Sequence, residues 1–143
     1  MTRLKYLALL LAAQAVIAPG CGGSDDNLVV PPSPVTITEP PFTGTIGVNG
    51  AATQFFAATS FGTVTLTIMA LDPNPDNSVR VTLALGTWNA QLNTCSVVLS
   101  NDNAGLGTAI IGSAARAGNL CARISDVGKL TEPVSFEIKI EHP

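Results

Sequence analysis

The stretch Val134-Ser-Phe-Glu-Ile-Lys-Ile-Glu141 decides the fold. Its apolar residues stand at every second position, with a polar residue between each pair. A period of two is typical of a β-strand with one face in the core and one in water. The same alternation occurs over residues 63–71, where threonines separate Val64, Leu66 and Ile68, and again over residues 79–85. The sequence therefore predicts several strands that each bury one face.

Shorter apolar runs and turn signals extend this pattern to the rest of the domain. Further strands are expected at 43–48, 53–58, 94–100, 108–114 and 119–125. Residues that favour turns separate them, at 49–50, 72–77, 100–105, 117–118 and 126–128. Glycines interrupt the best helix candidate, residues 104–118. We predict an all-β fold, a single antiparallel, jelly-roll-like β-sandwich of about eight strands over residues 42–143.

The first twenty residues have the pattern of an export signal. Arg3 and Lys5 precede an apolar run over residues 6–17. A helix of that length is too short for a hydrocarbon layer of about 30 Å, so the run indicates a secretory signal peptide rather than a membrane span.

The residues that follow resemble the bacterial lipobox, in which a small residue precedes a cysteine that becomes lipidated. Gly20 and Cys21 fit this pattern, whereas Ala18 stands where the family prefers leucine and Pro19 is unusual. The resemblance implies that Cys21 is the new N-terminus and carries the lipid anchor. The protein would then sit on the cell membrane or the outer membrane, facing the periplasm or the exterior. The alternative is an ordinary signal peptide with a free thiol at Cys21.

A proline-rich tether is expected between the lipid and the domain. Residues 21–41 contain five of the ten prolines, which cannot join a central strand. Residues 35–38 can form a short edge strand between them. A proline-rich ligand for a partner is the alternative, but an extended stalk is favoured.

With Cys21 assigned to the lipid, Cys95 and Cys121 remain as a pair in an oxidising compartment. A disulfide between them would stabilise the domain by about 3.5 kcal/mol on the chain-entropy model. Strand alternation places Cys95 on the same face as Val97 and Leu99, whereas it places Cys121 on the face opposite Leu120 and Ile124. The two cysteines would thus be on different faces, and the bridge requires a bulge or a position near a strand end. The alternative, a redox-active thiol, lacks a C-x-x-C spacing.

Composition and motifs argue against most enzyme and nucleic-acid functions. The formal charge is −3 and the pI about 4.8, so no basic footprint for nucleic acid exists. A catalytic triad would have to use His142, the single histidine, and no G-x-S-x-G motif accompanies it. Neither a P-loop nor a dinucleotide motif is present, so no cofactor is expected.

Two further features have both a structural and a functional interpretation. Asp72, Asn74 and Asp76 resemble the start of a calcium loop, but the glycine and glutamate of the helix-loop-helix version are missing, which favours a hairpin turn. Trp88 precedes Cys95, so the Cys-Trp-Cys order of immunoglobulin domains fails. We expect Trp88 in the core or at its rim, after a strand that ends at Leu85. A ligand contact by stacking on a sugar is the alternative.

The whole strand set resembles the bacterial pre-peptidase C-terminal domain. The residues that carry the resemblance are Gly44-Thr-Ile46, Phe55-Phe56, Val64 to Ile68, Val79 to Leu83, Ala117 to Ile124 and Val134 to Ile140. The resemblance implies a small, non-catalytic, jelly-roll-like β-sandwich. The family's Asp-rich segment and the Leu-Tyr that follows it are absent, and Arg80-Val-Thr-Leu83 stands there instead, which puts calcium binding in doubt.

We therefore expect an exported, membrane-anchored, non-catalytic lipoprotein whose β-sandwich binds an envelope protein or polysaccharide. Two alternatives stay open. The chain could be a purely structural component of an envelope assembly, or a small hydrolase.

Overall fold

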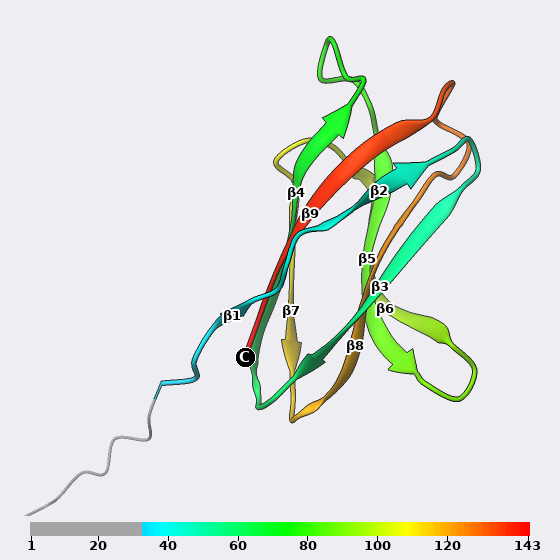
Figure 1. Cartoon of the computed structure of the whole chain (residues 1–143). Coiled ribbons are helices and arrows are strands. Elements are labelled where there is room, and N and C mark those ends of the chain that lie inside the picture. Colours follow the sequence, from blue (N-terminus) through cyan, green and yellow to red (C-terminus); the bar gives the residue numbers. More distant parts are fainter. Residues whose placement is uncertain (1–32) are drawn as a thin grey trace, which may run out of the picture. The chain divides into compact units, whose positions relative to one another are not determined.

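The computed structural model describes residues 33–143, which form nine strands and no helix in that range (Figure 1). The strands are β1 (Ile37–Thr38), β2 (Phe42–Ile46), β3 (Ala51–Ala58), β4 (Gly62–Asp72), β5 (Val81–Asn89), β6 (Thr94–Ala104), β7 (Ala109–Ala114), β8 (Gly118–Ser125) and β9 (Val134–His142). The prediction of an all-β fold is confirmed, with nine strands where about eight were expected.

The strands form two antiparallel sheets that pack face to face as a sandwich. In the five-stranded sheet, β9 pairs with β4 on one side and with β1 and β2 on the other, and β7 lies beyond β4. The four-stranded sheet has the order β3-β8-β5-β6. Because β3 and β6 are its edges, each pairs with a single neighbour.

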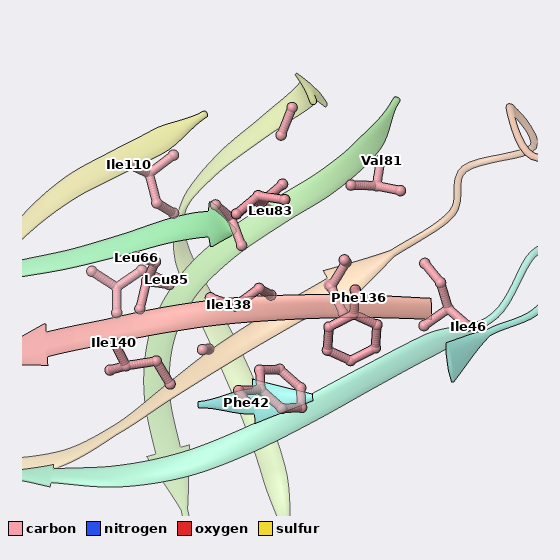
Figure 2. Close-up of a cluster of buried hydrophobic side chains, with 14 of the residues drawn as sticks. Phe42, Ile46, Leu66, Val81, Leu83, Leu85, Ile110, Phe136, Ile138 and Ile140 are labelled. Carbon is pink, nitrogen blue, oxygen red and sulfur yellow. The ribbon is translucent and has the colours of Figure 1, made fainter. Parts of the chain in front are cut away.

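The core lies between the sheets and is built from every second residue of the strands (Figure 2). The predicted inward residues of β9, Val134, Phe136, Ile138 and Ile140, are all buried. Phe136 meets Phe42 of β2 edge to face, with ring centroids 4.9 Å apart. The alternation that decided the fold therefore also fills the core.

The β5–β6 hairpin differs from the predicted strand limits. β5 continues past Leu85 to Asn89, and β6 runs to Ala104 through the predicted turn at 100–105. The actual turn begins at Asn89, whose side-chain oxygen accepts hydrogen bonds from the N–H groups of Gln91 and Leu92. Hydrogen bonds of this kind, from nearby backbone N–H groups to an asparagine side chain, stabilise a turn that contains no glycine or proline.

The sheet begins before the expected domain boundary at Phe42. β1, within the predicted edge strand at 35–38, pairs with the end of β9. The signal peptide, Cys21 and most of the predicted tether lie outside the described residues. Within the described range, no helix is long and apolar enough to cross a membrane.

Candidate functional site

The predicted disulfide between Cys95 and Cys121 is formed, with the two Cα atoms 5.8 Å apart. Cys95 belongs to β6 and Cys121 to β8, and these strands flank β5 on opposite sides. The bridge therefore crosses over β5 on the outer face of the four-stranded sheet.

A β-bulge in β6 brings Cys95 to that face. Leu99 pairs with Leu85, but the next pair is Val97 with Gly86, so Val98 is an extra residue. The bulge reverses which side chains of β6 face outward. Without it, Cys95 would share the inward face with Leu99. The expectation that the bridge needs a bulge or a position near a strand end is confirmed, since Cys95 is also the second residue of β6.

Gly86 makes room for this crossing. A Cβ built on Gly86 would lie 2.3 Å from the carbonyl oxygen of Ser96. Ser96 therefore lies directly over the Cα of Gly86, and the adjacent Cys95 reaches across β5 to Cys121. The side chain of Cys121 is fully buried although it points away from the core.

Two aromatic side chains flank the bridge on the outer face. Phe55 of β3 pairs in register with Cys121, and Trp88 of β5 pairs with Cys95. Their ring centroids are 6.1 Å apart and their planes are inclined by 43°. Phe55 is 48% exposed, and Trp88 is half-buried. The disulfide joins β6 to β8; β6 pairs with β5, which carries Trp88, and β8 pairs with β3, which carries Phe55.

The position of Trp88 corrects the sequence-based expectation. Trp88 was expected in the core or at its rim, after a strand ending at Leu85; it is half-buried, belongs to β5 and faces outward. The β5 strand continues because β6 pairs with it as far as Asn89. Phe55 was named only for the family resemblance and was not predicted as a site residue. Its neighbour Phe56 is in the core, so alternation requires Phe55 to face outward.

Polar side chains lie next to the aromatic pair on the same face. Two residues from Phe55 along β3, Thr53 pairs in register with Arg123 of β8. The Arg123 guanidinium donates a hydrogen bond to the Thr53 hydroxyl, at 3.3 Å. An exposed aromatic surface beside hydrogen-bonding groups is chemically suited to a ligand with apolar C–H faces and hydroxyls, such as a sugar.

In the calcium-like stretch, Asp72 is the last residue of β4, and Asn74 and Asp76 lie in the loop between β4 and β5. The side-chain oxygen of Asn74 accepts a hydrogen bond from the N–H of Val79 at 3.0 Å, and its amide nitrogen donates to Asn77 at 3.3 Å. Asn74 is thus engaged within the loop, while Asp72 and Asp76 are exposed. No group of three or more His, Cys, Asp or Glu side chains in residues 33–143 is placed to hold a metal ion.

His142 connects the two ends of the described chain. Its ring is 1% exposed and packs on Phe56 with centroids 5.1 Å apart. Nε2 lies 2.9 Å from Glu39 Oε1, and Nδ1 lies 3.1 Å from the carbonyl oxygen of Pro143. Since both ring nitrogens face oxygen atoms inside the protein, His142 serves to hold the segment after β1 against β9.

Asp126 is a buried acidic residue that sequence reasoning placed only in a turn. Burial raises the pKa of its carboxyl group, but hydrogen bonds from the backbone N–H groups of Asn49, Lys129, Leu130 and Gly128 outweigh burial and leave the pKa below its ordinary value. The carboxylate thereby joins the β2–β3 turn to the β8–β9 loop.

No protein-family model matches the chain, and no curated protein gives a significant match. The resemblance to the pre-peptidase C-terminal domain therefore stays a prediction.

Proposed function

We propose that this chain is an exported, lipid-anchored, non-catalytic binding module. Its β-sandwich would bind an envelope polysaccharide through the outer face of the four-stranded sheet. The observation that carries this proposal is the Phe55–Trp88 pair, in which each ring stands opposite one cysteine of the disulfide.

The geometry favours a saccharide because it combines apolar rings with nearby polar groups. A sugar ring presents C–H bonds that pack on aromatic faces, while its hydroxyls need hydrogen-bond partners. Arg123 and Thr53 supply such partners two residues along the strands. The disulfide joins β6 to β8 across β5, and β3 pairs with β8 along its length, so little ordering is needed when the ligand binds.

Export and anchoring rest on the N-terminal sequence and on the cysteines. A disulfide persists in an oxidising compartment and not in a reducing cytosol. Cys21 would carry the acyl chains, and more than one chain is needed for stable attachment. The intact mass of the protein extracted from membranes tests both points. We expect cleavage before Cys21, an acyl increment on it, and two hydrogens fewer for the bridge. An unmodified, soluble product would contradict the anchor.

The proposed absence of catalysis is supported by the position of His142. Both ring nitrogens contact oxygen atoms of the protein, so a His-dependent hydrolase would find no free imidazole among residues 33–143.

Retention on immobilised envelope polysaccharide tests the binding proposal. We expect the full chain to be retained, and Phe55→Ala and Trp88→Ala to lose most of that retention. Phe61→Ala is the matched control, because Phe61 is an exposed phenylalanine in the β3–β4 turn, outside the candidate site.

Cross-linking in native envelopes separates the alternatives. A discrete cross-linked protein without glycan retention would make the partner a protein. If neither binding mode is found, the chain is a structural component and the proposal fails.

A further inference from the structure

A second site lies at the other end of β5 from Trp88. A cleft of about 400 Å³ opens there between the β4–β5 loop and the β8–β9 loop. Its lining includes Arg80, Lys129 and Glu132. We propose that this cleft binds the oxyanion of a small acidic ligand, a carboxylate or a phosphate.

The guanidinium of Arg80 is held in place before any ligand arrives. Its Nη1 donates to the carbonyl oxygens of Asn77 and Val79, each at 2.8 Å. It also lies against Gly105, where a Cβ would stand 2.8 Å from Nη1. The two bonds engage Nη1 alone, so Nη2 and Nε keep donors for a ligand. A planar guanidinium with free donors is well suited to carboxylate and phosphate.

Lys129 brings the second positive charge from a different loop. Its backbone N–H donates to Asp126 Oδ1 at 2.7 Å, which fixes the loop, and its ammonium group donates to the carbonyl oxygen of Asp102. Asn74 fixes the opposite loop in the same way, through Val79. Both walls of the cleft are therefore ordered by internal hydrogen bonds.

The charges of Arg80 and Lys129 are not neutralised by an acidic partner. Among the described residues, the ion pairs within 4.0 Å are Lys139 with Glu141 and His142 with Glu39. Arg80 and Lys129 contact backbone carbonyls instead, which carry no net charge. Two cations without an ion-pair partner among the described residues line this cavity with a single carboxylate, Glu132, so the lining keeps an excess of positive charge in a chain of net charge −3, which favours an anionic ligand.

Glu132 is the acidic residue in the cleft lining. Its replacement should change the affinity for an anion in the opposite direction to the replacement of Arg80 or Lys129. Its carboxylate would repel an oxyanion, so Glu132→Gln should strengthen anion binding. Arg80→Gln and Lys129→Gln should each weaken it, about tenfold for the loss of one charge-assisted hydrogen bond. Opposite effects from residues of opposite charge would show that the ligand is an anion.

Gly105→Ala tests the fixed position of the guanidinium without changing any charge. The added Cβ would displace the Arg80 guanidinium, so we expect weaker anion binding. Arg116→Gln is the control for net charge, because Arg116 is exposed in the turn between β7 and β8.

The experiment is an NMR titration of the full chain with D-glucuronate, glucose 6-phosphate, inorganic phosphate and neutral glucose. We expect saturable shifts of the amides at 79–80 and 129–132 with the acidic probes and none with glucose. The affinities for glucuronate and for the two phosphate probes, compared with one another, show whether the cleft prefers a carboxylate or a phosphate. The proposal is overturned if no probe saturates, if glucose gives the same shifts, or if Arg116→Gln weakens binding as much as Arg80→Gln. Because the aromatic face lies at the far end of β5, its variants should leave this titration unchanged.

Discussion

The carbonyl oxygen of Ser96 lies over Gly86, at a point where any side chain on residue 86 would collide with it. This contact lets the start of β6 lie over β5, and it places Cys95 within reach of Cys121. The Phe55–Trp88 pair depends on the same arrangement, since each ring stands opposite one of the cysteines.

Gly86→Ala should destabilise the domain by about 2 kcal/mol or more, because the methyl group meets backbone atoms that cannot rotate away. Urea unfolding measures the loss. Gly47→Ala is the matched control, since a Cβ at Gly47 meets nothing within 4 Å. Equal stability of the two variants would contradict the close approach.

Replacing both cysteines of the bridge by alanine should lower the free energy of unfolding by about 3.5 kcal/mol on the chain-entropy model. The loop closed by Cys95 and Cys121 has a sequence separation of 26. Unfolding with and without reductant checks the value. Reductant should destabilise the natural chain and leave the double variant unaffected, and a natural chain indifferent to reductant would argue against the bridge.

The stability contributed by Asp126 should depend on pH. Its folded pKa is lower than its ordinary value, so the folded protein binds fewer protons than the unfolded chain as the pH falls. The contribution is therefore complete above the unfolded pKa, about 3.9, and is lost as the pH falls through the folded pKa.

Comparison of the natural chain with Asp126→Asn across pH measures this effect. We expect a gap in unfolding free energy that is constant near neutral pH and narrows in acid. Asp76→Asn, in an exposed loop, should follow the natural chain throughout. A gap that persists undiminished into strong acid would show that the ionised carboxylate is not the stabilising form.

His142→Ala should lower stability by about 2–4 kcal/mol, since it leaves a cavity beside Phe56 and removes the partner of Glu39. Hydrogen exchange at the Glu39 amide, which donates to the carbonyl of Ile140, should also accelerate. Glu39→Gln keeps an oxygen at the same position, so it should lower the free energy of unfolding less than His142→Ala does. Unchanged exchange in His142→Ala would contradict a role in holding the segment after β1.

The fold was predictable from sequence where one side of a strand is buried. Alternation in β9, and in β4 as far as Ile68, is regular because both strands lie inside the five-stranded sheet and face the core on one side; a register shift between Ile68 and Ala70 then changes the phase of β4. β6 breaks the rule, since Val97, Val98 and Leu99 are consecutive apolar residues and all three are exposed. A bulge at the edge of a sheet leaves no periodic signal, so the length and register of β6 could not be predicted.

The candidate site was predictable only in part. Trp88 and the cysteine pair stood out by residue type, and the need for a bulge followed from strand parity. The pairing of Phe55 with Cys121 could not be predicted, because it depends on the register between β3 and β8. Arg80 and Lys129 line one cleft although they come from loops far apart in the sequence. Such contacts depend on tertiary structure and have no local signature.

Trp88 is the single tryptophan of the chain, so its fluorescence reports directly on the proposed binding face. Titration of the full chain with envelope polysaccharide is the most direct test of the central claim. We predict a saturable change in emission that Phe55→Ala abolishes and Phe61→Ala preserves. Emission that stays constant while the polysaccharide binds, or a change that survives Phe55→Ala, would show that the Phe55–Trp88 face is not the binding site.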